Sequence, residues 1–146
     1  MQTVLIVDDD KDIVNALRIY LSPEGYHILE ASNGKEAIAK IESEHVDLIL
    51  MDIMMSEMDG VTATVKLREI SNIPIILLTA KSEDSDKILG LNVGADDYIT
   101  KPFNPMEVIA RVRSQLRRYT MLGGTKQSSN EIVVGSIVMD DDAKIV

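Results

Sequence analysis

Five polar residues of this 146-residue chain stand at or just after the ends of short apolar runs: Asp8, Asp9, Asp52, Thr79 and Lys101. If these runs are parallel strands of one sheet, their carboxyl ends meet at one edge. Ligands of open α/β sheets bind at that edge. The sequence therefore predicts a polar site in which three carboxylates, a hydroxyl and an ammonium converge.

The three carboxylates favour a divalent cation. Asp8 and Asp9 are adjacent, and Asp52 would approach them from a neighbouring strand. Magnesium prefers such hard oxygen ligands and commonly joins one or two carboxylates to phosphate oxygens. Without a cation the carboxylates would repel one another and the pKa of one of them should rise. We therefore expect Mg²⁺ to be the cofactor.

The same cluster could carry phosphoryl chemistry. A carboxylate can attack phosphorus to form an acyl phosphate, and such transfer depends on positioning and charge neutralisation. We assign the attack to Asp52, whose strand should be central, with Lys101 supplying a compact positive charge and Thr79 a hydroxyl donor. Taken singly, these residues are as easily explained as caps, strand ends or solvated charges. We expect Asp10 to be structural, because the next helix needs an N-cap.

Strand and helix signals alternate five times, which favours a parallel sheet with crossover helices on both faces. Strands are expected near Val4–Val7, His27–Glu30, Leu48–Met51, Ile75–Leu78 and Tyr98–Thr100. A first helix is expected after the aspartates, closed by Pro23 and Gly25, and others from Lys35 to Glu44, from Gly60, from Ser85 to Val93 and from Pro105. The near-continuous apolar strands fit a sheet that is covered on both faces.

The pattern changes after Tyr119. Residues 122–130 include Gly123 and Gly124, show little periodicity and have the composition of a flexible linker. Residues 131–146 have the pattern of strands around an acidic turn, which are too short to bury a core of their own. We expect a domain over residues 1–120, a linker over 121–130, and over 131–146 the first strands of a truncated second domain.

Composition narrows the setting of the protein. The chain has no cysteine, which excludes a disulfide framework and fits a reducing compartment. Its net charge of −9 opposes direct attraction to nucleic acid or anionic lipid. The N-terminus shows no export signal, and its apolar run is far too short to span a membrane. We expect a cytoplasmic protein with no membrane partner.

Residues 2–120 resemble the receiver domain of two-component response regulators, specifically those of the OmpR/PhoB-type winged-helix subfamily. The segments that carry the resemblance are Val4–Asp10, Leu48–Met55, Met58–Gly60, Pro74–Ala80 and Gly94–Phe103. The resemblance implies an α/β, flavodoxin-like fold: a doubly wound (βα)5 structure whose five-stranded parallel sheet has the strand order 2-1-3-4-5. It also implies that residues 131–146 are the opening of a winged-helix DNA-binding domain whose DNA-reading helices are absent.

The resemblance further implies the chemistry of the site. A sensor histidine kinase would donate a phosphoryl group to Asp52. Magnesium would be held by Asp9, Asp52 and the backbone carbonyl of Met54, with Asp8 acting through water. We therefore expect a phosphoacceptor switch that controls transcription in its complete form, with at most slow self-phosphorylation and self-dephosphorylation, and not an enzyme.

The resemblance also implies a response to phosphorylation. Thr79 would turn toward the phosphoryl group and Tyr98 would move inward, as a population shift driven by local charge. The Lys101–Pro102 bond is expected to be cis. A symmetric homodimer would then form through three cross-chain ion pairs: Lys87 with Glu107, Asp96 with Arg111, and Asp97 with Arg118. Exposed ion pairs contribute little to affinity, so these pairs should mainly set partner choice.

One departure from the family stands in the loop after Asp52. The proline that is usual there is replaced by Ser56, followed by Glu57. Lost rigidity and an added carboxylate near the metal could alter phosphorylation or dephosphorylation rates, although no required group is removed.

Three other site types fit the sequence less well. A haloacid dehalogenase-type, magnesium-dependent aspartyl phosphatase would use Asp8 and Asp10 as its D-x-D motif, but that motif needs Thr or Val at Asp12 and leaves Asp52 unexplained. A calcium loop starting at Asp8 would need glycine at Ile13. A flavin module is disfavoured because the acidic loop after the first strand would repel a phosphate.

Overall fold

The computed structural model describes residues 1–55, 57–80 and 94–127, with side chains described up to residue 120. The chain divides into two compact units, Met1–Val112 and Arg113–Val146. Within the described part, no helix is both long and apolar enough to cross a membrane.

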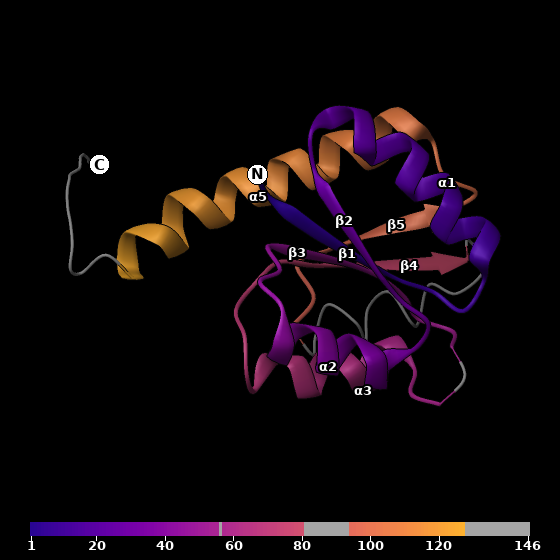
Figure 1. Ribbon diagram of the computed structural model, residues 1–146, viewed down its shortest axis with the longest axis horizontal. Helices are drawn as coiled ribbons and strands as arrows, with labels where there is room; N and C mark the ends of the chain where they lie inside the picture. The colour runs from indigo at the N-terminus through magenta and orange to yellow at the C-terminus, as the bar shows by residue number, and fades with distance from the viewer. Residues whose placement is uncertain (56, 81–93, 128–146) are drawn as a thin grey trace. The chain divides into compact units, whose positions relative to one another are not determined.

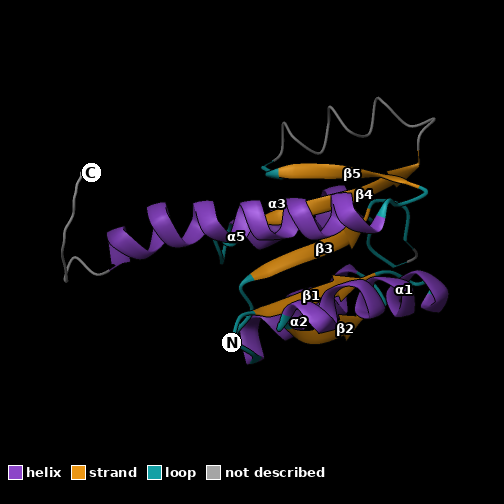
Figure 2. Ribbon diagram, turned by 90° about the horizontal axis from the view of Figure 1, so that it is seen from above, coloured by secondary structure: helices purple, strands orange, loops and turns teal. Residues whose placement is uncertain are grey.

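The first unit is built on a five-stranded sheet in the order β2-β1-β3-β4-β5, in which every neighbouring pair is parallel (Figure 2). The strands are β1 (Thr3–Val7), β2 (His27–Ala31), β3 (Leu48–Asp52), β4 (Ile75–Ala80) and β5 (Asp97–Lys101). All five predicted strands are confirmed, and so is the predicted strand order. Because β1 and β3 are neighbours, their carboxyl ends lie side by side.

Helices cover both faces of this sheet. They are α1 (Lys11–Leu21), α2 (Gly34–Ser43), α3 (Gly60–Arg68) and α5 (Pro105–Gln127), with a short 3₁₀ helix at Ser22–Glu24. α1 and residues 105–112 of α5 lie on one face, and α2 and α3 lie on the other (Figure 1). The doubly wound arrangement is thus confirmed. The helix expected over Ser85–Val93 falls outside the described residues.

Each helix that follows a site loop starts at a side-chain cap. Asp10, as predicted, caps α1 by accepting a hydrogen bond from the Asp12 N–H at 2.9 Å. Asn33 caps α2 in the same way, and Asp59 caps α3 through the Thr62 N–H at 2.7 Å. Such caps satisfy backbone donors that the first helical turn leaves unpaired. They fix where the loops after β1, β2 and β3 end.

The core explains the strand sequences. Every residue of β1 and β3 is buried, and Leu5, Ile49 and Leu50 have no exposed surface. A strand that is covered on both faces needs apolar side chains in both directions, which is why these strands are continuous apolar runs and do not alternate. Asp8 and Asp52, at the ends of β1 and β3, are therefore attached to strands that are buried along their whole length.

The helix α5 is longer than the sequence pattern indicates. It continues to Gln127, into the segment over 121–130 that we expected to be a linker. Gly123 and Gly124 are poor helix formers, but each residue added to an existing helix gains a backbone hydrogen bond at little nucleation cost. Residues 128–146 lie outside the described residues, so the domain boundaries stay a prediction.

Candidate functional site

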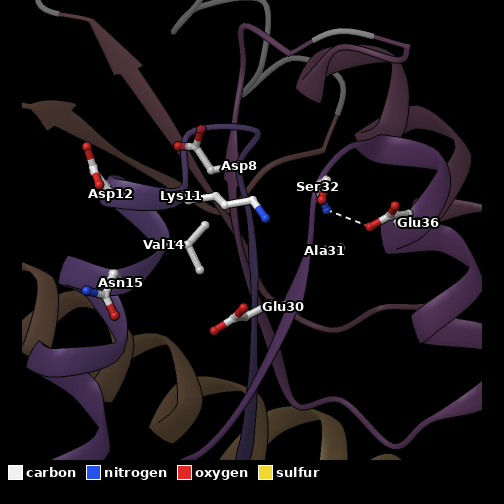
Figure 3. Close-up of a pocket in the computed structure, with 9 residues that line it drawn as sticks. All are labelled: Asp8, Lys11, Asp12, Val14, Asn15, Glu30, Ala31, Ser32 and Glu36. Atoms are coloured by element: carbon white, nitrogen blue, oxygen red, sulfur yellow. Dashed lines mark hydrogen bonds between the residues drawn. The ribbon is translucent and has the colours of Figure 1, made fainter.

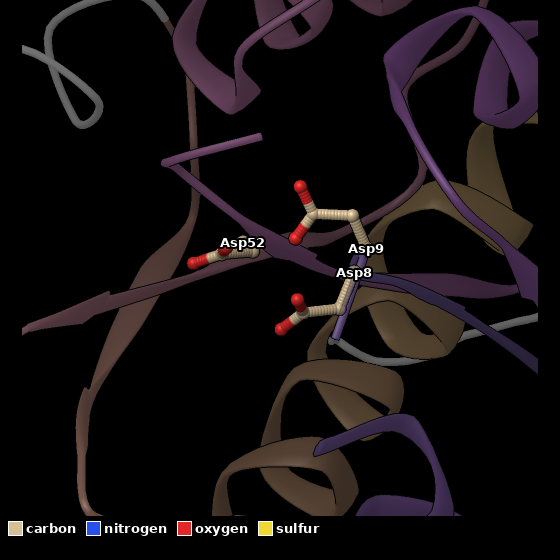
Figure 4. Close-up of side chains that lie close together, drawn as sticks. All are labelled: Asp8, Asp9 and Asp52. Carbon is tan, nitrogen blue, oxygen red and sulfur yellow. The ribbon is translucent and has the colours of Figure 1, made fainter. Parts of the chain in front are cut away.

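Three carboxylates meet at the carboxyl end of the sheet. Asp8 follows β1 directly, Asp9 is next in sequence, and Asp52 is the last residue of β3. One oxygen from each lies within 4.8 Å of the others (Figure 4). The parallel register that pairs Val7 with Met51 brings them together. The convergence predicted from the strand ends is present.

Asp8 is the most constrained of the three. It is 3% exposed, and its Oδ1 accepts a hydrogen bond from the Asp10 N–H at 2.9 Å. Its buried Oδ2 has no hydrogen-bond partner among the described residues; the Lys101 Nζ is 3.6 Å away. Burial raises the pKa of Asp8 to about 6, opposed by the Asp10 hydrogen bond and aided by the charge of Asp52. An unpartnered buried oxygen of this kind is costly unless a cation approaches it.

Asp52 and Lys101 form the second part of the site. The Lys101 Nζ donates to Oδ1 of Asp52 at 3.1 Å, and Asp52 is 5% exposed. Burial raises the pKa of Asp52 even though Lys101 and the Met54 backbone lower it. Burial lowers the pKa of Lys101, but Asp52 and Asp8 outweigh it, so the pKa lies above its usual value. At neutral pH the lysine is a fixed positive charge beside the carboxylates.

The acidic cluster fits a magnesium ion. Asp8, Asp9 and Asp52 present hard oxygen atoms close together, and Oδ2 of Asp8, which has no hydrogen-bond partner among the described residues, is free to coordinate a cation. The net charge of the three carboxylates exceeds what Lys101 alone can neutralise. The donor set is therefore suited to magnesium.

Gly60 fixes the loop that leaves Asp52. Its N–H donates to the Ile53 carbonyl at 2.9 Å, and its own carbonyl accepts from the buried Thr64 hydroxyl at 2.7 Å. A Cβ at Gly60 would lie 2.4 Å from the backbone carbonyl oxygen of Asp52. The sequence indicated Gly60 only as a helix start. Its second role is to leave room for the Asp52 carbonyl. A glycine directly after an N-cap is the signal for that role, but the signal can be interpreted only when the position of the neighbouring backbone is known.

The two proposed switch residues and Met54 lie near this edge. Thr79 is 1% exposed in β4, and its hydroxyl donates to the Ala80 carbonyl at 3.3 Å. Tyr98 is half-buried in β5. Met54 follows β3, with an exposed side chain and a backbone hydrogen bond to the Asp52 carboxylate. The Lys101–Pro102 bond is cis, as predicted.

Some residues predicted for the dimer interface pair within the chain. Arg111 contacts both carboxylate oxygens of Asp97, at 2.8 and 2.9 Å, and its Nε donates to Glu107 at 3.1 Å. Asp96 pairs at 2.6 Å with Arg68, a residue that no sequence pattern had indicated. Lys87 lies outside the described residues, and Arg118 belongs to the second unit. The cross-chain pairs stay a prediction.

A cavity of about 480 Å³ lies beside the acidic cluster (Figure 3). Its walls come from the start of α1, the end of β2 and the start of α2, and Asp8 belongs both to the cavity and to the cluster. Its charged lining is mainly acidic, with Asp12, Glu30 and Glu36 set against Lys11. Glu57, which stands in the loop after β3, has a left-handed φ of 70°, and its carboxylate is 3.8 Å from the Lys35 ammonium of α2.

Comparison with known proteins agrees with this geometry. Residues 4–113 match the family model described as the response regulator receiver domain. The chain is 44% identical over 133 residues to the regulatory protein VanR of Enterococcus faecium, covering 91% of this chain and 58% of that protein. It is 45% identical over 139 residues to the alkaline phosphatase synthesis transcriptional regulatory protein PhoP of Bacillus subtilis (strain 168), covering 94% and 58%.

A solved structure of a response regulator has a similar fold. The crystal structure of a two-component response regulator from Clostridium difficile is similar with a TM-score of 0.77 and 40% identity, covering 81% of this chain and 98% of that one. The chain spans a little over half the length of the two curated relatives, 58% in each case. From the family match, the relatives and the shared fold, we conclude that the chain belongs to the response regulator receiver domain family, in its OmpR/PhoB-type branch.

Proposed function

We propose that Asp52 accepts a phosphoryl group from a sensor histidine kinase and that this modification switches the chain to a dimer. The observation that carries the proposal is the meeting of Asp8, Asp9 and Asp52 within 4.8 Å, with the Lys101 ammonium 3.1 Å from Asp52. Phosphoryl transfer needs a nucleophilic oxygen and fixed positive charge around the transferred group. The family to which the chain belongs supports the same chemistry.

In the proposed step, a carboxylate oxygen of Asp52 attacks phosphorus. The new oxygen–phosphorus bond forms as the bond between phosphorus and the imidazole nitrogen of the kinase histidine breaks, and the imidazole leaves. Asp9, Asp52 and the Met54 carbonyl would hold a magnesium ion, with Asp8 acting through water, and the ion would supply positive charge to the phosphoryl oxygens. Lys101 adds a second positive charge that is in place before the reaction.

Thr79 is suited to report the modification. Its hydroxyl makes only a 3.3 Å hydrogen bond to the Ala80 carbonyl, which is long for an O–H donor and so costs little to exchange. A phosphoryl oxygen is a stronger, charged acceptor. We propose that Thr79 turns to it and that Tyr98, in the neighbouring β5, moves inward. The edge strand then carries the signal to the dimer surface.

The proposed dimer uses Lys87, Asp96, Asp97, Glu107, Arg111 and Arg118, and its role is transcription control. The curated relatives include a transcriptional regulatory protein. DNA recognition would belong to a winged-helix domain. Residues 131–146 resemble the opening of such a domain. Transfer from a kinase inside the cell would place the chain in the cytoplasm.

A phosphatase of the haloacid dehalogenase type is not favoured. Its D-x-D motif needs Asp8 and Asp10 to face the same group. The Asp10 carboxylate instead caps α1. Asp52, which is not part of that motif, lies in the carboxylate cluster. We propose a switch with at most slow self-phosphorylation and self-dephosphorylation.

The test is the intact mass of the wild type and Asp52→Asn after incubation with magnesium and a small acyl phosphate. We expect one phosphoryl adduct on the wild type and none on the variant. Asp59→Asn is the matched control: it makes the same chemical change at an exposed N-cap, where Asn caps as well as Asp, and should retain the adduct. An adduct that survives in Asp52→Asn would move the nucleophile to another carboxylate and contradict the proposal.

A further inference from the structure

Arg68, at the end of α3, is bound on three sides by its own chain. Its Nε donates to the Gly94 carbonyl at 2.9 Å, its Nη1 to the Ile73 carbonyl at 2.7 Å, and its Nη2 to Oδ2 of Asp96 at 2.6 Å. Its side chain is 21% exposed. The guanidinium thus ties the segment before β5 to the loop before β4. No compact ammonium could make these three contacts at once.

Asp96 is fixed but accessible. Its Oδ2 accepts a second hydrogen bond, from the Ile75 N–H at 2.9 Å, and its own N–H donates to the Ile75 carbonyl at 2.8 Å. Even so, its side chain is 35% exposed. A carboxylate has about four acceptor positions, and these contacts use two of them. Asp96 is therefore an oriented carboxylate that still has capacity for another donor.

The backbone at Gly94 is shaped to allow this contact. Gly94 has a φ of +115°, a conformation that L side chains rarely adopt, and a Cβ there would lie 3.0 Å from Cγ of Arg68. The segment before β5 therefore passes close to the arginine stem. This close passage sets Asp96 at the head of β5 with little freedom.

Two adjacent carboxylates thus have separate partners within the chain. Asp97 is held by Arg111, which also contacts Glu107, whereas Asp96 is held by Arg68. Arg68 comes from α3, which contributes none of the residues proposed for the dimer surface. Its contacts with Asp96 and with the nearby Gly94 carbonyl give it a way to influence that surface.

We propose that Arg68 is a positioning residue for self-association, holding Asp96 in the orientation in which a basic residue of a second copy of this chain reaches it. The inference rests on the proposed dimer and adds a residue outside it. Fixing an interface side chain before binding lowers the ordering cost of association. Because a two-fold dimer contains the contact twice, a small loss at Asp96 counts twice.

The test is the dimer dissociation constant of the phosphorylated chain, measured by sedimentation equilibrium with magnesium and an acyl phosphate donor. Arg68→Lys keeps the charge and loses the forked donors; we expect the constant to rise about tenfold. Arg18→Lys is the matched control. Arg18 also binds a carboxylate, that of Glu30, through two guanidinium nitrogens, but between α1 and β2, and its constant should not change.

A second background separates positioning from general loosening of the fold. In Asp96→Asn the dimer should be weaker, and adding Arg68→Lys should weaken it no further. If Arg68→Lys weakens the Asp96→Asn dimer as much as it weakens the wild-type dimer, Arg68 acts through the Gly94 and Ile73 carbonyls. That result would overturn the inference. If Arg68→Lys does not fold, Arg68→Gln, which keeps an amide donor for those carbonyls, replaces it.

The outcomes also separate this inference from the proposed function. A wild type that carries the phosphoryl adduct but stays monomeric refutes the proposed dimer and this inference with it. A wild type that dimerises while Arg68→Lys dimerises equally well or more tightly refutes only the role of Arg68. A tighter dimer in Arg68→Lys would mean that Arg68 neutralises the charge of Asp96 and so weakens its attraction to the partner's basic residue.

Discussion

We expect Asp8→Asn to make the protein more stable at neutral pH in the absence of divalent cations. The pKa of Asp8 rises from 3.8 to about 6 in the folded chain, chiefly through burial. Since one pKa unit corresponds to about 1.4 kcal/mol, keeping this buried carboxylate ionised at pH 7.5 costs about 3 kcal/mol of unfolding free energy. Asparagine removes the charge and keeps an oxygen for the Asp10 N–H. Its amide also needs partners, so we expect a net gain of about 1–3 kcal/mol.

The sign of the pH dependence follows from proton binding. Between pH 3.8 and 6 the folded chain holds a proton on Asp8 that the unfolded chain has released. The unfolding free energy contributed by this group therefore falls as pH rises through that window and is constant above it. Asp52, whose pKa is also raised by burial, acts in the same direction. The Asp8→Asn variant should lose the part of this slope that Asp8 contributes.

The assay is urea unfolding at pH 5 and pH 7.5 in the presence of a chelator, followed by the same experiment with magnesium. Magnesium should stabilise the wild type by mass action and should stabilise Asp8→Asn much less. Asp10→Asn serves as the control, because Asp10 is an exposed N-cap and Asn caps equally well. A variant that is less stable than the wild type at pH 7.5 without cations, or that keeps the full pH slope, would refute this account of the site.

Three further substitutions test other parts of the site. Lys101→Met should lower the unfolding free energy at pH 7.5 by about 3 kcal/mol, because it leaves the buried Asp52 carboxylate without its cation; equal urea midpoints would contradict this. Gly60→Ala should cost about 2–4 kcal/mol and slow adduct formation, since its Cβ would meet the Asp52 carbonyl at 2.4 Å; a normal adduct rate would show that the loop yields freely. Glu57→Gly should raise the thermal stability by about 0.5–1 kcal/mol by relieving a φ of 70°, at the loss of only an exposed contact with Lys35; a lower melting temperature would mean that this contact matters more than the backbone.

The strands and the acidic cluster could be predicted because their signals are local. A strand that is buried on both faces must be a continuous apolar run, and a carboxylate at its end must lie at the sheet edge, whichever side chains surround it. The cap at Asp10 is equally local, since an N-cap bonds a backbone N–H two or three residues ahead. The length of α5 was harder to predict, because helix propagation depends on the preceding turns as well as on Gly123 and Gly124.

By itself, the sequence determined which residues meet: Asp8, Asp9, Asp52 and Lys101 are placed by the strand ends and by the strand order that the family resemblance implies. Only the tertiary structure decided which hydrogen bonds and ion pairs each of these side chains makes. Whether an oxygen of Asp8 lacks a hydrogen-bond partner, and whether Asp96 pairs with Arg68 or with another arginine, depends on distances of a few tenths of an ångström between elements far apart in the chain. Hydrogen bonds and desolvation vary steeply over such distances, whereas the hydrophobic pattern that selects the fold does not.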